Sequence, residues 1–292
     1  MKVGLQINRF DYPGGDPRIG ENIRVIAKAS EDVGFDSLWV MDHFFQIGHI
    51  GPYTDPMLEA YTTLGFLAGI TSKVQLGTMV TGVIYREPAV LIKAVTSLDV
   101  VSGGRAYFGI GAGWNDQEAK ALGLTDPLNA RRFTRLEDTL KLALQMWEGN
   151  SKPFKGEIYN LPEPYMNPQS VSRPHPPILI GGGGEEKTLR FVAQYGDACN
   201  LFASDLAQLK HKLEVLKKHC QEIGRNYDEI EKTSLAGVQL TEAANNIADQ
   251  KKRVEELKSL GIDHIIYAVS NDAERASYEM FAECIDYIHD LN

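Results

Sequence analysis

Apolar residues along the chain follow two periodicities. Short apolar runs predict β-strands, and longer segments with an apolar residue every three or four positions predict amphipathic helices. The expected strands cover residues 3–7, 37–40, 74–80, 106–111, 177–182, 199–202, 233–240 and 264–269. The expected helices follow them at residues 21–33, 58–70, 89–101, 130–147, 185–195, 206–223, 245–260 and 273–291, with a further short helical stretch ending near residue 122.

This order of elements predicts the fold. Strands separated by helices of such length pair in parallel through right-handed crossovers. Eight strand–helix units in one chain favour an α/β fold of the closed (β/α)8 type, a TIM barrel, over an open doubly wound sheet. Residues 149–177 depart from the pattern because they are rich in proline and have little periodicity. We interpret them as an insertion between the fourth helix and the fifth strand of a single domain spanning residues 1–292, either functional or an inert surface loop.

Composition excludes several classes of protein. The formal net charge of -9 and the isoelectric point near 5.3 argue against a nucleic-acid partner, which selects a basic surface. No apolar stretch reaches the roughly 20 residues that span a bilayer, so no membrane segment is expected. Three widely spaced cysteines, Cys199, Cys220 and Cys284, predict buried thiols in a reducing compartment. We therefore expect a cytoplasmic protein that acts on a small molecule.

Polar residues and glycines follow several of the expected strands at their C-terminal ends, where barrels of this type carry their active sites. Asp42 and His43 end the second strand in "SLWVMDHFFQ". An imidazole can donate or accept a proton near neutral pH, so His43 is a candidate acid or base, although a lone histidine is more often structural. The remaining histidines show no spacing typical of metal ligands, and no metal site is expected.

Four consecutive glycines follow the fifth expected strand in "GGGGEEKT". A strand that runs through glycines into a helix exposes backbone N–H groups beside the positive end of the helix dipole, which suits a phosphate or carboxylate. A tight turn that requires positive φ is the alternative. The earlier run "GIGAGW" lacks the last glycine of the dinucleotide fingerprint, so a Rossmann fold is rejected.

Taken in order, these segments resemble the bacterial luciferase-like superfamily, and within it the branch that uses the deazaflavin coenzyme F420. The resemblance is carried by "GFDSLWVMDHF", "LGTMVTG", "RAYFGIGAGWNDQEAKALG", "RRFTRLEDTLKLALQMW" and "ILIGGGGEEKTLRFVAQYGDACNLF". It is strong from Val3 to about Phe202 and more diffuse afterwards. It implies a TIM-type barrel that is usually dimeric, so we expect a homodimer.

The resemblance also implies roles for residues near the reacting ring. Asp42 would lie against the deazaflavin ring, and His43 would serve proton transfer beside the substrate. Met79 and Val80 match the position of a bulge with a non-proline cis peptide behind the ring.

Other positions would hold the rest of the cofactor. Gly111, Ala112 and Gly113 would line its side chain, and the run Gly181, Gly182, Gly183, Gly184 with Glu185 would bind its phosphate. Trp114 stands where the family's sugar-6-phosphate dehydrogenases carry a catalytic glutamate, so that route of sugar phosphate oxidation is not expected. A tryptophan suits an aromatic or apolar wall of the cofactor site, with ordinary packing at the rim as the alternative.

The leading hypothesis is an F420-dependent oxidoreductase of the luciferase-like type that transfers a hydride between the cofactor and a small organic substrate. A deazaflavin has carbon where a flavin has N5, so the resemblance implies hydride transfer and little reaction with oxygen. One alternative is an FMN-dependent luciferase-like monooxygenase, and another is a non-catalytic member that only binds a cofactor. Asp42, His43 and the glycine run favour the first hypothesis.

Overall fold

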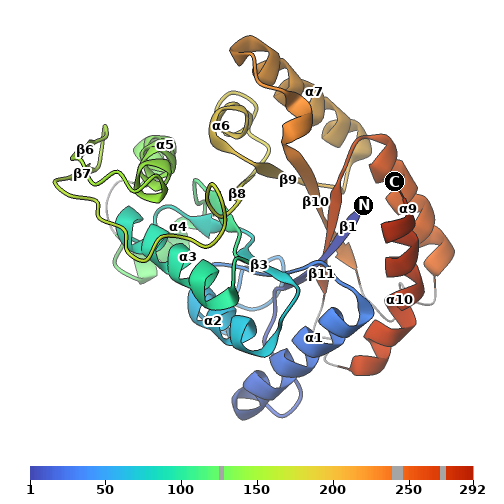
Figure 1. Ribbon diagram of the computed structural model, residues 1–292. Coiled ribbons are helices and arrows are strands. Elements are labelled where there is room, and N and C mark those ends of the chain that lie inside the picture. The colour runs from blue at the N-terminus through green and yellow to red at the C-terminus, as the bar shows by residue number, and fades with distance from the viewer. Residues whose placement is uncertain (125–127, 239–245, 270–273, 292) are drawn as a thin grey trace.

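The computed structural model describes residues 1–124, 128–238, 246–269 and 274–291 of the chain. Parallel strands lie at the centre and helices surround them (Figure 1). The central strands are β1 (Lys2–Ile7), β2 (Ser37–Val40), β3 (Gln75–Thr78), β4 (Thr81–Gly82), β5 (Phe108–Gly111), β8 (Ile178–Gly181), β9 (Ala198–Phe202), β10 (Glu231–Val238) and β11 (His264–Val269). The helices are α1 (Ile19–Val33), α2 (Ala60–Ile70), α3 (Pro88–Ser102), α4 (Asp116–Ala121), α5 (Leu128–Trp147), α6 (Thr188–Tyr195), α7 (Leu206–Ile223), α9 (Ile247–Ser259) and α10 (Arg275–Asp290).

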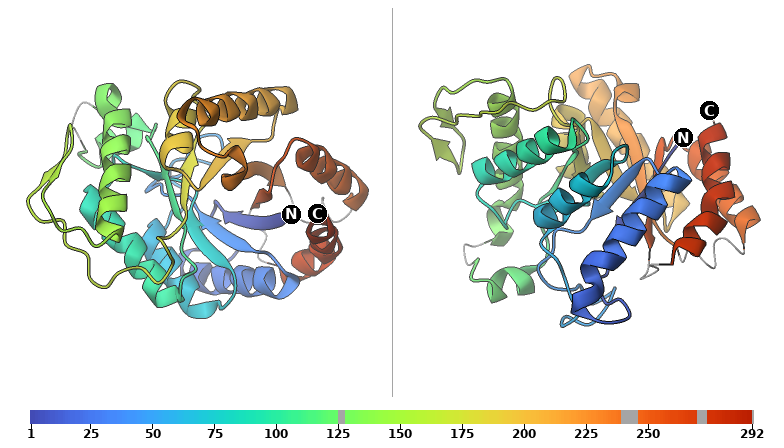
Figure 2. Two further views of the ribbon diagram at one scale, coloured as in Figure 1. Left: turned by 45° about the horizontal axis from the view of Figure 1, so that its top comes forward. Right: turned by 60° about the horizontal axis from the view of Figure 1, so that its bottom comes forward.

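The strand order β3-β2-β1-β11-β10-β9-β8-β5-β4 gives a nearly closed sheet (Figure 2). Strands β3 and β4, at its two ends, are separated in the chain by only Met79 and Val80. An isolated parallel bridge between Leu76 and Ala106 joins the two ends. The predicted α/β barrel is therefore confirmed. The third expected strand, 74–80, corresponds to β3 alone, and β4 follows it at Thr81–Gly82, where no strand was expected.

Several predicted boundaries differ from those observed. Helix α6 begins at Thr188 instead of residue 185, because residues 185–187 form a turn. The expected strand at 233–240 and the expected helices at 245–260 and 273–291 extend into residues 239–240, 245 and 273, which lie outside the described residues. Within the described part of the chain, no helix is long and apolar enough to cross a bilayer.

The segment between α5 and β8 contains a small hairpin. Strand β6 (Phe154–Lys155) pairs antiparallel with β7 (Asn160–Leu161), outside the barrel sheet. The buried carboxylate of Asp99 on α3 accepts hydrogen bonds from the backbone N–H groups of Val171 and Ser172 and so holds the later part of the segment against the barrel. The interpretation of residues 149–177 as an insertion stays a prediction.

Alternation along the strands divides the apolar core into two clusters. A large cluster joins the outer faces of the strands to the helices. A small cluster draws on several strands and includes Trp39, Met79, Tyr107, Leu179, Ala198 and Ile266. These six residues lie on the strands or directly beside them, at positions all around the sheet. They therefore fill the barrel interior beneath the C-terminal rim.

A polar cluster surrounds Glu231 at the N-terminal ends of the strands. Its carboxylate accepts a hydrogen bond from Tyr107 Oη at 2.7 Å and lies 3.0 Å from Lys2 Nζ and 3.3 Å from Nδ1 of the buried His264. Nε2 of His264 lies 3.0 Å from Ser37 Oγ. Burial alone would raise the pKa of Glu231, but its contacts with His264, Lys2 and Tyr107 outweigh burial and lower that pKa to about 2.

Glu231 is expected to make the fold sensitive to acid. Its pKa is below the usual 4.5 in the folded state, so its stabilising effect is complete above pH 4.5 and is lost as the pH falls towards 2. The full effect is about 3 kcal/mol, since one pKa unit corresponds to about 1.4 kcal/mol. Urea unfolding of the wild type and Glu231→Gln between pH 7 and 3 measures it. The stability difference should shrink as the pH falls, and a constant difference would contradict the assignment.

The three cysteines are buried, as predicted from their spacing. Burial raises the pKa of Cys199 to about 12 and that of Cys284 to about 11, and it also raises the pKa of Cys220.

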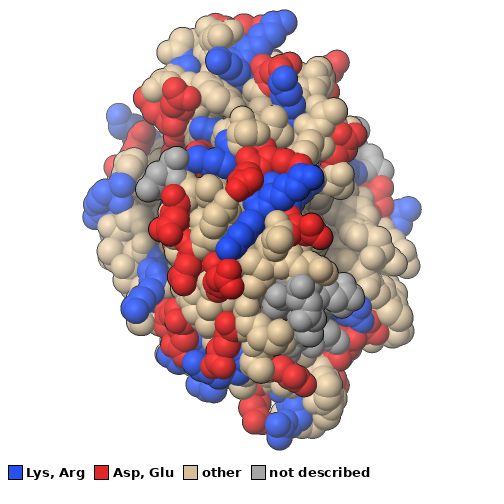
Figure 3. All heavy atoms as spheres, turned by 90° about the vertical axis from the view of Figure 1, so that its right-hand side faces the viewer, with Lys and Arg blue, Asp and Glu red and all other residues tan. Residues whose placement is uncertain are grey.

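The exterior of the protein carries many charged side chains. On the face that carries α9 and α10, acidic and basic side chains are interspersed (Figure 3).

Candidate active site

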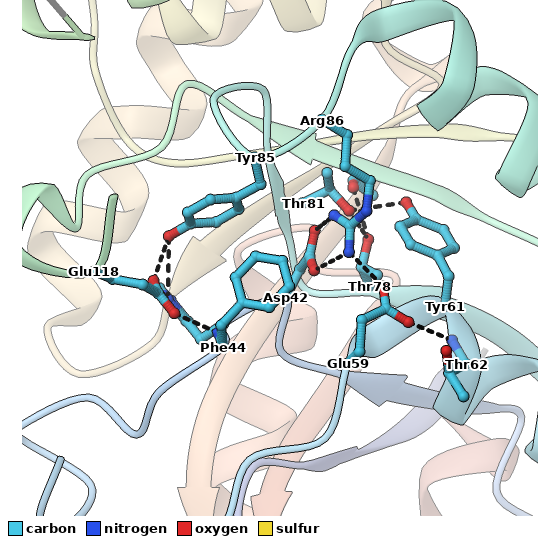
Figure 4. Close-up of polar contacts among 12 residues, drawn as sticks. Asp42, Phe44, Glu59, Tyr61, Thr62, Thr78, Thr81, Tyr85, Arg86 and Glu118 are labelled. Atoms are coloured by element: carbon cyan, nitrogen blue, oxygen red, sulfur yellow. Dashed lines mark hydrogen bonds and ion pairs between the residues drawn. The ribbon is translucent and has the colours of Figure 1, made fainter. Parts of the chain in front are cut away.

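The end of β2 is fixed by an ion pair between Asp42 and Arg86 (Figure 4). The guanidinium donates to both carboxylate oxygens of Asp42, at 2.6 and 3.0 Å, and also to Glu59. The rings of Phe44 and Tyr61 lie 5.6 and 5.0 Å from the guanidinium carbon. Arg86 therefore ties the loop after β2 to the loop before α3.

Asp42 is only 1% exposed, and this burial raises the pKa of its carboxyl group while the bidentate contact with Arg86 opposes the shift. Burial disfavours the charged form of Arg86 as well, but Asp42 and Glu59 outweigh it and raise the Arg86 pKa. Both oxygens of Asp42 are thus engaged by the protein. The contact with Arg86 holds Asp42 in place at the end of β2. The expected place of Asp42 against the cofactor ring stays a prediction.

His43 is held by a carboxylate that the sequence analysis did not single out. Nδ1 of His43 lies 2.8 Å from Oε2 of Glu118, a residue of α4 that is fully buried. The other oxygen of Glu118 accepts hydrogen bonds from the backbone N–H groups of Phe44 and Phe45. Tyr85 Oη donates to Oε2 of the same carboxylate at 2.5 Å (Figure 4). With Nδ1 occupied, Nε2 is the ring nitrogen of His43 that can exchange a proton with a ligand.

The carboxylate of Glu118 is ionised at neutral pH. Burial opposes ionisation of Glu118, but hydrogen bonds from His43 and Tyr85 and the histidine charge lower its pKa below the usual value. Burial and the nearby Glu118 raise the pKa of Tyr85, so its hydroxyl remains a donor. Glu118 is therefore an ionised acceptor that fixes the orientation of the imidazole.

Trp114 lies beside His43 on the open side of the rim. The two ring centroids are 5.5 Å apart with the rings nearly perpendicular, and 56% of Trp114 is exposed. The ring centroids of His49 and Trp114 are 6.3 Å apart. The position next to His43 agrees with a wall of a ligand site, while its role as a cofactor contact stays a prediction.

The peptide bond between Met79 and Val80 is cis, as the family resemblance implies. The buried side chain of Gln6 donates to the carbonyl of Met79 at 3.2 Å. Glycines make room for this bulge: a Cβ on Gly111 would lie 2.9 Å from Val80, and one on Gly181 would lie 2.8 Å from it. The absence of a side chain at Gly111 and Gly181 is thus explained by close packing against Val80, and their expected contact with a cofactor stays a prediction.

Ala112 and Gly113 follow β5 beside this bulge. Gly113 has φ +78°, and a Cβ there would meet Ile84 at 3.0 Å. The carbonyl of Gly113 accepts a hydrogen bond from Arg132 at 2.7 Å. The turn that carries Ala112, Gly113 and Trp114 is therefore anchored from both sides, and its place along a cofactor side chain remains an expectation.

The glycine turn, residues 181–184, lies between β8 and α6. Gly182 has φ +114°, which favours glycine, whereas a Cβ on Gly183 would meet only ordinary contacts, 3.7 Å from Lys212 and 3.9 Å from Leu201. Gly184 is constrained by Thr188, whose Oγ1 would lie 2.9 Å from an added Cβ. The turn therefore offers an open stretch of backbone at Gly183.

Glu185 makes contacts that the sequence analysis did not anticipate. Its carboxylate lies 2.5 Å from Nζ of Lys212 and 3.2 Å from Nε2 of His211, both on α7. The backbone carbonyl of Glu185 lies 2.8 Å from Nε2 of His219. Glu185 thus recruits cationic side chains of α7 to the glycine turn, and Lys212 is the better candidate for direct contact with an anion.

Sequence reasoning missed further residues that the fold places at the rim. Glu118, Tyr85, Arg86 and Lys212 are described above. Asn8 follows β1, two positions after Gln6; it is 9% exposed, and its Oδ1 has no hydrogen-bond partner within the described residues. Asn8 could have been identified from its position after the first strand, because His43 was identified from its position after the second strand. In the described chain, no group of three His, Cys, Asp or Glu side chains is placed to hold a metal.

The barrel and the side chains gathered at its rim define an α/β-barrel enzyme. The chain belongs to the luciferase-like monooxygenase family, whose sequence profile matches residues 7–290, and it is a luciferase-like oxidoreductase.

Two curated relatives and one solved structure give the closer context. An F420-dependent glucose-6-phosphate dehydrogenase of Kineococcus radiotolerans is 32% identical over 243 residues, covering 80% of this chain and 66% of that protein, just under two thirds of its length. The protein of the same name from Amycolatopsis mediterranei is 28% identical, with 94% of this chain and 87% of that protein covered. An F420-dependent secondary alcohol dehydrogenase, solved with an F420–acetone adduct, shares the fold at a TM-score of 0.81 and 20% identity, covering 99% of this chain and 100% of that chain.

Proposed function

We propose that the protein is an F420-dependent oxidoreductase that transfers a hydride between F420 and a small organic substrate. The observation that carries the proposal is the buried Glu118 carboxylate, which holds Nδ1 of His43 and leaves Nε2 for proton exchange at the rim. The two curated relatives named as F420-dependent, at 32% and 28% identity, support the choice of cofactor.

The residues present fit F420. A cofactor with a phosphate suits the open backbone at Gly183 with Lys212 beside it. Oδ1 of Asn8, which has no hydrogen-bond partner in the described part of the chain, is a buried acceptor suited to a ring N–H donor. Met79 and Val80, at the cis peptide, would form the wall behind the ring.

The protein residues supply the proton chemistry. When bound, F420 supplies a carbon centre that accepts or donates a hydride. In the oxidation of an alcohol, Nε2 of His43 would accept the proton of the substrate hydroxyl. In the reverse direction, it would return that proton. Glu118 orients the imidazole throughout and stabilises its charged form.

The family name supports a second candidate function, a monooxygenase, for which the sequence analysis gave FMN as the alternative cofactor. Parallel titrations of the purified protein with F420 and FMN, followed by fluorescence, separate the two. We expect F420 to bind at least about tenfold more tightly, a difference of about 1.4 kcal/mol. Preferential binding of FMN would favour the monooxygenase, and binding of neither would favour a non-catalytic member.

Gly183→Asp is expected to lower the affinity for F420 by about tenfold or more, because the new carboxylate repels a phosphate at the glycine turn. The added side chain itself fits, since a Cβ at this position meets only ordinary contacts. Gly183→Ala is therefore the matched control and should bind F420 within a few-fold of the wild type. Equal affinities of all three proteins for F420 would show that the phosphate does not bind at this turn.

A further inference from the structure

The connections that leave the C-terminal ends of the barrel strands are strongly acidic. Among the described residues they comprise 8–18, 41–59, 83–87, 112–115, 182–187 and 203–205. Their sequences contain nine Asp or Glu residues but only four basic ones, Arg9, Arg18, Arg86 and Lys187. Recognition of a phosphate or carboxylate depends on cations that are not already neutralised, so the partners of these four decide which substrates the rim can accept.

Two of these residues, Arg9 after β1 and Arg86 after β4, are already paired with carboxylates. Arg86 is engaged by Asp42 and Glu59, and its side chain is only 15% exposed. Arg9 donates to both oxygens of Asp11, at 2.9 and 2.6 Å, and lies 3.6 Å from Asp55. Neither guanidinium can bind a substrate anion without giving up a carboxylate.

The other two basic residues, Arg18 and Lys187, have different partners. Arg18 forms an exposed pair with Glu21 at 3.1 Å, and Nζ of Lys187 lies 5.2 Å from the ring centroid of Phe133 on α5. Lys187 belongs to the turn after the glycines, where Lys212 also reaches the rim from α7. The basic groups thus concentrate at the glycine turn, the place proposed for the cofactor phosphate.

The exposed surface beside His43 is aromatic instead. Trp114 stands edge-on to His43 with more than half of its surface exposed, and the His49 ring lies 6.3 Å from it between centroids. An exposed indole is a favourable surface for an apolar or aromatic group, and it carries no positive charge to pair with an anion.

Building on the proposed function, we infer that the substrate is an uncharged organic molecule whose apolar or aromatic part packs on Trp114 while its polar group meets Nε2 of His43. A phosphorylated or carboxylate substrate would lose its hydration opposite an acidic rim whose arginines are already paired with carboxylates, and it would be rejected. This distinguishes the protein from relatives that are named for glucose 6-phosphate.

A matched pair of ligands tests the charge preference: acetophenone and 4-acetylbenzoate, with glucose and glucose 6-phosphate as a second pair. Binding is measured by isothermal titration calorimetry at low ionic strength, with and without F420, and turnover is followed with reduced F420. We expect acetophenone to bind at least about tenfold more tightly than 4-acetylbenzoate, and glucose 6-phosphate to bind no more tightly than glucose. Tighter binding of either anion, or no binding of acetophenone, would overturn the inference. Failure of F420 to bind would count against the proposed function instead, because the charge preference is also measured without the cofactor.

Variants test the part played by Trp114. Trp114→Ala should weaken acetophenone binding by about tenfold, the effect of losing an aromatic contact. Tyr165→Ala removes an aromatic side chain that is 68% exposed in the segment between α5 and β8, and it should leave acetophenone binding unchanged. Equal losses in both variants, or none in Trp114→Ala, would exclude Trp114 from the substrate site.

Discussion

Replacing His43 with alanine is expected to lower turnover by about 10²- to 10⁴-fold, the range typical for loss of a general acid or base. Affinity for F420 should change little, because the glycine turn and Lys212 that would hold the phosphate are separate from the histidine. Stopped-flow or steady-state assays on the F420-loaded protein measure kcat, and a fluorescence titration measures affinity. Turnover within a few-fold of the wild type would exclude His43 as the proton donor or acceptor.

Glu118→Gln should reproduce part of this loss through the orientation and charge of the imidazole. We expect kcat to fall by about 10- to 100-fold, as for other groups that orient a reactive histidine. Glu231→Gln is the matched control: it removes a partly buried carboxylate at the opposite end of the barrel. A comparable loss of kcat in both variants, or in neither, would contradict a positioning role for Glu118.

Gly109→Ala is expected to have the largest effect on stability. A Cβ at residue 109 would lie 1.8 Å from the carbonyl oxygen of Thr78, which is backbone and cannot move aside. Thr78 also donates its hydroxyl to the carbonyl of Gly109 at 2.8 Å, so β3 and β5 are held in this close approach. Overpacking against a rigid neighbour should cost about 4 kcal/mol or more.

Thermal unfolding followed by circular dichroism measures this effect. A loss of that size corresponds to a decrease in Tm of about 10 °C for a domain of this length, or to failure to fold. Gly237→Ala is the control, because Gly237 also lies in a barrel strand and an added Cβ would meet nothing within 4 Å. A Gly109 variant as stable as the Gly237 variant would show that the barrel tolerates wider separation of β3 and β5.

The order of elements was predictable because each strand and helix carries its own periodicity. His43 was identifiable for the same reason: it directly follows a buried strand, and the ends of parallel strands share one rim. The cis peptide at Met79–Val80 came from the family resemblance, since a local sequence of Thr, Met and Val gives no physical indication of it.

Partners of these residues could not be predicted in the same way. Glu118 lies 75 residues after His43 on a short helix with acidic and basic neighbours, a pattern typical of a solvent-exposed face. It is nevertheless buried, in contact with the loop after β2 through Phe44 and Phe45 and with the loop after β4 through Tyr85. Likewise, the sequence analysis expected Glu185 to bind the cofactor phosphate. In the structure, its carboxylate contacts Lys212 and His211 of α7. Long-range pairing of charges depends on tertiary structure, which a single sequence does not reveal.

The burial of all three cysteines has a practical consequence for following these reactions in solution. Thiol-directed dyes react with the exposed thiolate, and each native thiol is both buried and shifted away from that form. A single cysteine introduced on the exposed surface would therefore be the one site of attachment, with no need to remove the others. A fluorophore placed at Tyr165, for example, would report on motion of the segment between α5 and β8 while cofactor and substrate enter the barrel.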